Sequence, residues 1–326
     1  MTDKQTILSG IRPTGRLHIG NYLGSVANFL QLQNEYRCFF FIADFHSLNE
    51  SFDPAGKYDQ IIDVARTYLA AGLDPKKCTL FVQSHVPQHA ELAIILSNII
   101  PASFLFRMTQ YKEKSTDRSQ ENVNAGLLFY PVLMAADILM YKATRVPVGQ
   151  DQTQHVELTR DAAAFFNSQF GKTFPEPQPL YTQTPKVMSL LVPDKKMAKS
   201  LGDGHCIYLD DEPETITKKI ARAVTDTGDG KSVGAQNLLS LVEIFCAAPT
   251  YKKFNADQRA GTIRYADLKK ALAGGIADYF ADFRQKKKKL TQPQIEKILA
   301  AGASDAQTVA AQTMEEVRKK IGLTRR

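Results

Sequence analysis

An apolar run, a turn rich in Gly and Pro, and an amphipathic helix follow one another in residues 6–22, and this order constrains the fold more than any other stretch. Ile7 and Leu8 predict a strand, the turn that follows ends near Gly15, and apolar periodicity predicts a helix over 19–34. A helix that opens from such a loop presents unpaired backbone N–H groups and the positive end of its dipole. The stretch therefore predicts a strand, loop and helix whose loop can bind phosphate.

The same alternation of strands and helices continues along the chain. Apolar runs predict strands at 38–43, 79–82 and from Arg145, and periodic segments predict helices at 56–71, 90–100 and 153–167. The polar segment 104–123 is compatible with a helical insertion or a mobile loop, and the three prolines of 174–180 predict a connector between domains. The pattern predicts an α/β domain with a doubly wound parallel sheet, in which ligands bind at the carboxyl ends of the strands.

From Pro213 onward the pattern is helical and strand signals almost vanish. Periodicity predicts helices over 216–224, 238–245, 256–273, 276–288, 292–301 and 306–321. At 326 residues the chain also exceeds the usual size of one domain. The sequence therefore predicts an all-α C-terminal domain after the α/β domain.

Charge and composition limit the kind of protein and partner. Residues 251–326 contain 17 Lys and Arg against 8 Asp and Glu, whereas residues 1–250 contain 24 against 26. This basic quarter favours a polyanionic partner larger than a nucleotide, although the run RQKKKK at 284–289 is also explained as a solvated helix face. No apolar run is long enough to span a membrane, the polar N-terminus MTDKQ is not the pattern of a signal sequence, and the four cysteines lack zinc-site spacing. We therefore expect a cytoplasmic protein without a structural metal.

The sequence HIGN places His18 and Asn21 at the opening of the first predicted helix, on one face. Gly20 lies between them without a Cβ, so a flat base or a sugar can approach the backbone there. The alternative is that His18 only caps or packs this helix.

Asp137 lies in the middle of the apolar helix predicted over 126–141. Burying a carboxylate is costly unless it is paired or accepts strong hydrogen bonds. Its helical stripe carries two aromatic rings and a thioether: Tyr130, Met134 and Tyr141. This set suits an aromatic ligand with a single N–H or O–H donor; the alternative is that Asp137 caps or pairs with Lys142 or Arg145.

Two later stretches carry further candidate groups. Residues 145–152 repeat the strand, Gly and helix order, and Asp151 can either cap that helix or hydrogen-bond a ribose hydroxyl. In the loop 194–204, Lys196 and Lys199 lie on either side of Met197 and Ala198. Two ammonium groups on a Gly-bounded loop can close over a polyphosphate and neutralise charge as a phosphoryl bond breaks; a charged surface loop is the alternative.

Three stretches in this order resemble the class I aminoacyl-tRNA synthetases: HIGN at 18–21, VPVGQDQTQHVELTRD at 146–161 and KMAKS at 196–200. HIGN resembles the HIGH signature of that family, and KMAKS, about 175 residues later, resembles the KMSKS signature. With GLLFYPVLMAADILMY at 126–141 and MTQYKEKS at 108–115, the chain is most similar to the tryptophan-specific members, over nearly its whole length.

The resemblance implies a fold and an activity. The fold is a Rossmann-like (HUP) catalytic domain over 1–200, a helical anticodon-binding domain over 201–293, and a helical segment over 294–326 that packs back toward the catalytic domain. The activity is activation of L-tryptophan by ATP with Mg²⁺ to tryptophanyl-adenylate, with release of pyrophosphate, and transfer of tryptophan to the 3′ end of tRNA(Trp). A homodimer is implied, and neither a membrane nor DNA is an expected partner.

The resemblance also implies site residues, position by position. The implied catalytic residues are His18, Asn21, Lys196 and Lys199. The implied ATP-binding residues are Arg12, Pro13, Thr14, Gly20, Asn21, Lys114, Gly149, Gln150, Asp151, Val187, Lys196, Met197, Ala198, Lys199 and Ser200. The implied tryptophan-binding residues are Tyr130, Met134, Asp137, Val146, Val148 and Gln152, with Asp137 accepting the indole N–H. Four positions depart from the usual pattern of the family: Leu8 replaces Phe, Arg12 replaces Gln, Gln150 replaces Glu and Ala198 replaces Ser.

Three other functions remain open at this point. A tyrosine-specific synthetase has a similar architecture, but residues 146–161 favour tryptophan. A non-catalytic RNA-binding relative does not need Lys196 and Lys199. A small nucleotidyltransferase of the same superfamily leaves the basic helical C-terminus unexplained.

Overall fold

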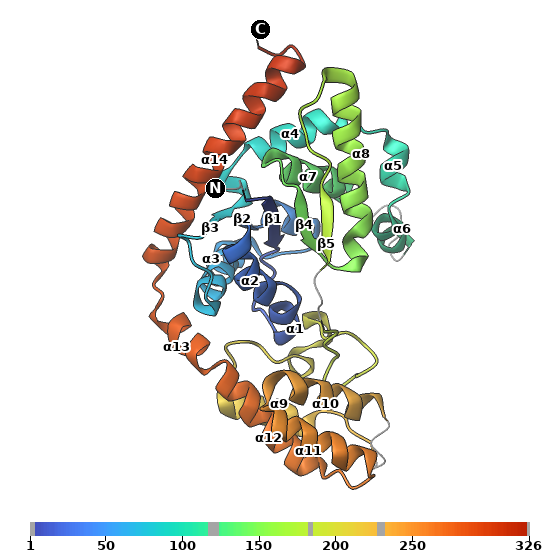
Figure 1. Ribbon diagram of the computed structural model, residues 1–326, viewed down its shortest axis with the longest axis vertical. Helices are drawn as coiled ribbons and strands as arrows, with labels where there is room; N and C mark the ends of the chain where they lie inside the picture. Colours follow the sequence, from blue (N-terminus) through green and yellow to red (C-terminus); the bar gives the residue numbers. More distant parts are fainter. Residues whose placement is uncertain (1–3, 117–123, 182–184, 227–231, 325–326) are drawn as a thin grey trace. The chain divides into compact units, whose positions relative to one another are not determined.

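The computed structural model describes residues 4–116, 124–181, 185–226 and 232–324, without the side chains of 113–116 (Figure 1). The chain forms two compact units. Unit 1 takes its residues from Met1–Gly15, Asn28–Gln183 and Thr291–Arg326, and unit 2 takes its residues from Arg16–Ala27 and Thr184–Leu290.

Unit 1 is built on a five-stranded sheet with the strand order β3-β2-β1-β4-β5. The strands are β1 (Thr6–Ile11), β2 (Arg37–Ile42), β3 (Cys78–Val82), β4 (Arg145–Val148) and β5 (Gln178–Tyr181), and all pairs are parallel. The interior strand β2 reads RCFFFI, and its last five residues are all buried, as expected of a strand covered on both faces. The predicted doubly wound α/β architecture is confirmed.

Helices surround this sheet (Figure 1). The helices of unit 1 are α2 (Ala27–Glu35, shared at its first residue with unit 2), α3 (Pro54–Ala71), α4 (Gln88–Ser97), α5 (Ala102–Phe106), α6 (Thr109–Thr116), α7 (Ala125–Met140), α8 (Thr153–Phe170) and α14 (Gln292–Lys320). Three short 3₁₀ helices follow strand ends: η2 (Phe45–Asn49), η3 (Gln83–His85) and η5 (Gln150–Gln152). Helix α7 packs against α4 and α8, and its inner face joins a core that includes Phe39, Phe81 and Phe166.

Helix α14 is continuous, although periodicity predicts two helices at 292–301 and 306–321. It packs against the edge strand β3 and against α3 and α4, so it covers an edge that would otherwise expose unpaired backbone groups (Figure 1). Gly302, which interrupts the apolar pattern, is the point of closest approach: a Cβ there would lie 1.9 Å from the carbonyl oxygen of Leu80. Tertiary packing therefore carries the helix through the glycine.

Two other sequence predictions need correction. The segment 174–180 is more than a connector, because its second half forms the edge strand β5. Pro179 pairs with Val146 on β4, and no strand pairs with the other side of β5, so proline is tolerated at this position. The single helix predicted over 19–34 is three consecutive pieces: α1 (Ile19–Asn21), the π-helical η1 (Tyr22–Val26) and α2.

Unit 2 is helical. Besides α1 and η1 it contains the 3₁₀ helices η6 (Lys199–Leu201) and η7 (Asp203–His205), and the helices α9 (Pro213–Arg222), α10 (Val233–Phe245), α11 (Ala248–Arg259), α12 (Tyr265–Tyr279) and α13 (Ala281–Lys289). The helix predicted over 256–273 is broken between α11 and α12, where Gly261 adopts φ 69°. Helix α12 packs against α9, α10 and α13. Within the ranges that the structure describes, no helix is both long and apolar enough to cross a lipid bilayer.

Candidate active site

The HIGN sequence forms the first turn of helix in unit 2. His18 is the N-cap of α1: its Nδ1 accepts a hydrogen bond from the backbone N–H of Gly20 at 3.1 Å, and its own N–H donates to Oδ1 of Asn21 at 3.1 Å. A Cβ on Gly20 would lie 2.9 Å from Cε1 of His18, so glycine leaves room for the imidazole itself. His18 does cap the helix, but this uses only one ring nitrogen and leaves Nε2.

His18 is 5% exposed and sits in a positive environment. Burial, followed by the charges of Lys199 and Lys196, lowers the pKa of His18 from 6.5 to about 4. The ring is therefore neutral near pH 7, and because Nδ1 is an acceptor, the hydrogen resides on Nε2. His18 can donate one hydrogen bond to a ligand oxygen without carrying a charge.

The KMAKS residues lie in the same unit as His18. The backbone N–H of Met197 donates to the carbonyl of Val187 at 2.9 Å, and Met197 is 2% exposed, which anchors the centre of the loop. Lys196 is exposed, and Lys199 begins the 3₁₀ helix η6. Both ammonium groups are near enough to His18 to depress its pKa. The structure thus brings together His18, Lys196 and Lys199, which come from opposite ends of the predicted α/β region of the sequence.

A network of charges holds the segment before His18 to the segment after the KMAKS loop. Arg16 donates to Asp210 at 2.6 Å and to Asp211 at 2.9 Å, and Lys219 donates to Asp211 at 2.9 Å. Backbone hydrogen bonds join the same segments, from Ile19 to Ile207 and from Leu209 to Leu17. These contacts position the HIGN turn relative to the rest of unit 2.

In unit 1, the loop after β1 and the 3₁₀ helix η5 after β4 both lie at carboxyl ends of strands, as the fold requires of a ligand site. Arg12 is exposed and pairs with Glu50 at 2.6 Å, and Lys57 donates to the carbonyl of Pro13 at 3.3 Å. Asp151 is exposed and accepts a hydrogen bond from Gln152 at 2.9 Å. It caps neither η5 nor α8, because neither helix has a side-chain cap.

Asp137 is buried in unit 1 at 1% exposure and is surrounded by donors. Nε2 of Gln83 lies 2.8 Å from Oδ1 and 3.0 Å from Oδ2; Nδ1 of His89 lies 2.6 Å from Oδ1, and Nε2 of His46 lies 2.7 Å from Oδ2. Burial opposes ionisation, but the hydrogen bonds from His46 and His89 outweigh it and hold the pKa of Asp137 below its ordinary value. Asp137 is therefore a carboxylate, and its partners are not Lys142 or Arg145.

None of the three partners of Asp137 is among the residues that the sequence pattern predicted. His46 follows β2 on η2, Gln83 follows β3 directly, and His89 lies in the first turn of α4. A signal was present: polar side chains that come directly after buried strands belong to the ligand-binding edge of a parallel sheet. Behind them, Nε2 of His89 lies 2.8 Å from the hydroxyl of Tyr141, and Oε1 of Gln83 is buried without a hydrogen-bond partner among the described residues.

The other residues predicted to contact an aromatic ligand lie in unit 1 with Asp137. Tyr130 and Met134 lie on α7, both half-buried, and Val146 and Val148 are buried on β4. The hydroxyl of Tyr130 lies 2.9 Å from Nε2 of His155 and donates to Gln110 at 3.1 Å; burial raises its pKa to about 12. Gln152 is half-buried on η5. The side chain of Lys114, predicted to contact ATP, lies outside the described residues, as α6 is described there by its backbone alone.

The basic run 284–289 is largely engaged inside unit 2. Arg284 is buried and donates to the carbonyl of Ala277 at 2.6 Å, and Lys287, 12% exposed at its side chain, pairs with Asp210 at 2.8 Å. Lys286 and Lys288 pair with Asp282 and Glu212 at 2.7 and 2.8 Å, in both cases with exposed side chains. Part of this run is therefore a structural element rather than a free surface for an anionic partner.

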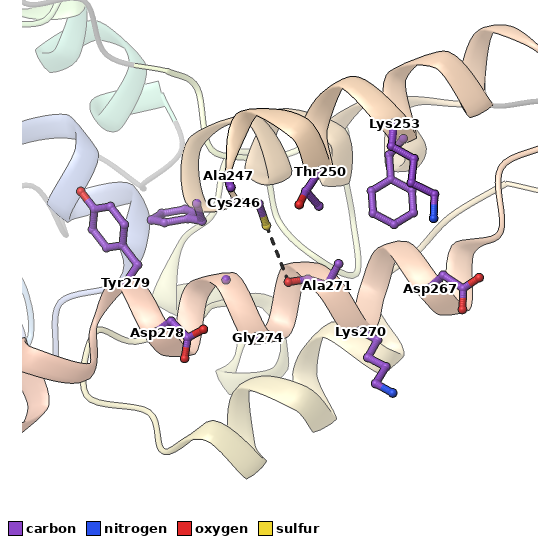
Figure 2. Close-up of a pocket in the computed structure, with 13 residues that line it drawn as sticks. Cys246, Ala247, Thr250, Lys253, Asp267, Lys270, Ala271, Gly274, Asp278 and Tyr279 are labelled. Atoms are coloured by element: carbon purple, nitrogen blue, oxygen red, sulfur yellow. Dashed lines mark hydrogen bonds between the residues drawn. The ribbon is translucent and has the colours of Figure 1, made fainter.

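A separate hollow of about 790 Å³ opens between α11 and α12 of unit 2 (Figure 2). Its lining includes apolar side chains from the end of α10 and from α11 and α12, and charged side chains of both signs: Lys253, Asp267, Lys270 and Asp278. Cys246 at its edge donates to the carbonyl of Ala271 at 3.6 Å. None of the predicted catalytic or ligand-binding residues lines this hollow.

Comparison with known proteins agrees with the resemblance of the motifs. The family model described as tRNA synthetases class I (W and Y) matches residues 1–281. A tryptophan-tRNA ligase of Caldanaerobacter subterraneus subsp. tengcongensis is 44% identical over 325 residues, which cover 97% of this chain and 98% of the relative.

Solved structures agree as well. Tryptophanyl-tRNA synthetase from Campylobacter jejuni, crystallised with ADP and tryptophan, superposes with a TM-score of 0.86 at 32% identity, covering 97% of this chain and 99% of that one. The enzyme from Mycoplasma pneumoniae superposes with a TM-score of 0.84 at 34% identity, covering 98% of both chains. The chain therefore belongs to the class I tRNA synthetases of the W and Y family, and within it to the tryptophan-tRNA ligases.

Proposed function

We propose that this protein joins L-tryptophan to ATP, forming tryptophanyl-adenylate and pyrophosphate, and then transfers the tryptophan to the 3′ end of tRNA(Trp). The observation that carries the proposal is Asp137, a buried carboxylate on the same helix as Tyr130 and Met134. A carboxylate in such a place can select a ligand by one N–H donor. A site built around a hydrogen bond rejects a ligand that lacks the donor far better than a site built on size alone.

The chemistry needs positioning and charge stabilisation rather than a protein nucleophile. The carboxylate of tryptophan attacks the α-phosphorus of ATP in line, a C–O–P anhydride forms, and the bond to pyrophosphate breaks. We assign the Nε2–H of His18 as a donor to an α-phosphate oxygen. Its depressed pKa keeps this group a neutral donor at physiological pH, so it does not exchange protons with the phosphate.

We assign Lys196 and Lys199 to the departing pyrophosphate. Negative charge builds on this group as the bond breaks, so cations that meet it there stabilise the transition state more than bound ATP. Mg²⁺ binds together with the triphosphate as part of the substrate and partly neutralises the negative charge of the phosphates. Ala198 removes one hydroxyl from the usual signature but leaves both ammonium groups, so this change should not abolish the reaction.

We assign the remaining nucleotide contacts to the two strand ends of unit 1, to Lys114 on α6, to the HIGN turn, and to the KMAKS loop with Val187. The residues are Arg12, Pro13, Thr14, Gly20, Asn21, Lys114, Gly149, Gln150, Asp151, Val187, Met197 and Ser200. Support comes from three features: Arg12 and Asp151 are exposed at carboxyl ends of strands, and Val187 is held against the KMAKS loop by the backbone bond to Met197. The hydroxyls of ribose suit Asp151, which no helix uses as a cap.

The absence of tryptophan from the chain allows a direct test. Fluorescence excited selectively in indole reports only the ligand, so titration of L-tryptophan with protein measures its binding. We expect saturable binding and tryptophan-dependent exchange of pyrophosphate into ATP, and no exchange with L-tyrosine. Exchange with tyrosine alone would replace the proposal by a tyrosine-specific enzyme, and tRNA binding without exchange would replace it by a non-catalytic relative.

We further propose that the helical unit contacts the anticodon arm of tRNA(Trp) and that the protein works in the cytoplasm. A basic excess concentrated after residue 250 supports the first assignment, since phosphate contacts dominate the affinity of proteins for nucleic acids. The division of the chain into an N-terminal catalytic domain, an anticodon-binding domain over 201–293 and a terminal segment over 294–326 stays a prediction.

We also propose a homodimer formed through the α/β unit. Ile94 on α4 and Phe106 on α5 are 60% and 50% exposed, and exposed large apolar side chains favour an interface. Sedimentation of the wild type should give twice the chain mass, and Ile94→Glu should give the mass of one chain. A wild type that sediments as a single chain at all concentrations would remove this assignment.

A further inference from the structure

Three donor groups of the chain make four contacts with the carboxylate of Asp137, because Nε2 of Gln83 reaches both oxygens. A carboxylate oxygen offers two lone pairs. Oδ1 receives Gln83 Nε2 at 2.8 Å and His89 Nδ1 at 2.6 Å, and Oδ2 receives His46 Nε2 at 2.7 Å and Gln83 Nε2 at 3.0 Å. A ligand N–H that binds Oδ2 therefore competes with donors of the chain, of which His46 makes the shorter contact to that oxygen.

The three donors differ in how freely they can leave. The side chain of His89 is 0% exposed, its second nitrogen contacts Tyr141, and Gln83 is 0% exposed. The side chain of His46 is 11% exposed and belongs to the five-residue 3₁₀ helix η2. His46 is the donor that can yield its hydrogen bond and still reach water, so its displacement leaves no buried polar group unpaired.

We propose that His46 is a specificity-determining residue that shares Oδ2 of Asp137 with the ring N–H of the substrate. Gln83 and His89 hold the carboxylate in place throughout, and His46 and the ligand donor exchange on Oδ2. The inference rests on the proposed function, because it takes Asp137 as the acceptor of an indole N–H.

The exchange has a consequence for selectivity. Tryptophan replaces one hydrogen bond to Oδ2 by another, and an isostere without the N–H leaves the His46 bond in place. Binding of the isostere therefore leaves no buried carboxylate oxygen without a hydrogen bond. His46 thus reduces the discrimination that a buried carboxylate would otherwise provide.

Equilibrium binding of two ligands tests this directly. L-tryptophan is followed by its own fluorescence, and β-(3-benzothienyl)-L-alanine, in which sulfur replaces the ring N–H, is measured by competition. We expect wild-type protein to prefer tryptophan by less than about 10-fold. In His46→Leu the competing donor is gone, so tryptophan should bind several-fold more tightly and the preference should rise by about 10-fold or more. His46→Gln retains an N–H donor and should behave as the wild type.

Two results would overturn the assignment. One is weaker tryptophan binding in His46→Leu with an unchanged preference, as expected if the ligand N–H binds elsewhere, for instance to the buried Oε1 of Gln83. The other is a preference of the wild type for tryptophan over the isostere above about 100-fold. This measurement uses only the wild type, so it does not depend on whether His46→Leu folds. Failure of the proposed function looks different, because then the wild type binds tyrosine or neither amino acid.

Discussion

At His18 the two ring nitrogens have separate roles. Nδ1 accepts from Gly20 and completes the cap of α1, which leaves Nε2–H for a ligand. Burial and two lysines depress the pKa to about 4, so His18 is a neutral hydrogen-bond donor at physiological pH. We assign the same two lysines to pyrophosphate. Their positive charge therefore helps to keep His18 neutral and also stabilises the leaving group.

This pKa makes folding stability depend on pH. The ordinary pKa of His18 is 6.5 and its folded value is about 4, so between these values the unfolded chain binds more protons than the folded chain. The free energy of unfolding therefore falls as pH decreases below 6.5. From pH 7 to pH 5 we expect His18 to account for a decrease of about 2 kcal/mol. Urea unfolding of wild type and His18→Asn at both values measures it, because Asn keeps a cap but has no titrating group. Equal pH dependence of the two proteins would contradict the assigned pKa.

Lys199 should act on the rate more than on the affinity for ATP. We expect Lys199→Ala to lower kcat for pyrophosphate exchange by about 10²–10³-fold, with a smaller change in KM for ATP. Lys195→Ala is the matched control, since Lys195 is an exposed neighbour that carries the same charge. An effect confined to KM, or an equal decrease in the control, would show that only the general positive field of the loop matters.

At the scale of elements, two glycines inside helices show how tertiary packing and helix propensity differ in their effects. Gly302 in α14 meets the backbone of Leu80 on β3, whereas Gly274 in α12 has no atom within 4 Å of the place a Cβ would take. Both lie inside helices, so periodicity and propensity treat them alike. Only the packing of α14 against an edge strand distinguishes them.

Alanine at each of these positions should therefore have opposite effects. We expect Gly302→Ala to destabilise unit 1 by about 1–3 kcal/mol through overpacking, and Gly274→Ala to stabilise its helix by about 0.5–1 kcal/mol through reduced chain entropy. Chemical unfolding followed by circular dichroism measures both variants. A stabilised Gly302→Ala would mean that α14 does not press on β3 as described.

At the scale of the whole molecule, the predicted site residues fall into two groups. Asp137 with its donors and the strand-end loops belong to unit 1, and His18 with the KMAKS lysines belongs to unit 2. The proposed reaction needs both groups, because the carboxylate of the amino acid attacks the nucleotide. Our proposal assigns a further task, contact with tRNA, to the basic helices of unit 2.

Exposed lysines of α13 should contribute to tRNA affinity without affecting adenylate formation. We expect Lys286→Glu with Lys289→Glu to weaken tRNA binding and to reduce the slope of log Kd against log salt by about 0.7–0.9 for each phosphate that a lysine no longer neutralises. Lys287 is left unchanged because its pair with Asp210 is part of the fold. The control is Lys76→Glu with Lys172→Glu, which makes the same charge change on exposed positions of unit 1. Equally weakened tRNA binding in both double variants, or a parallel decrease in pyrophosphate exchange, would refute this role.

The sequence alone determined the features that depend on local patterns of residues. Alternation of apolar strands and helices specified the parallel sheet, the motifs HIGN and KMAKS marked the group of site residues that unit 2 brings together, and a single Asp137 on an apolar helix required polar partners. Periodicity does not identify those partners, because His46, Gln83 and His89 reach Asp137 only when β2, β3 and α4 pack together. The tertiary structure also decided the continuity of α14, the protonation of His18 and the use of Lys287 in an ion pair. Each of these depends on packing, burial or charges that involve residues distant in sequence, which no local pattern of residues encodes.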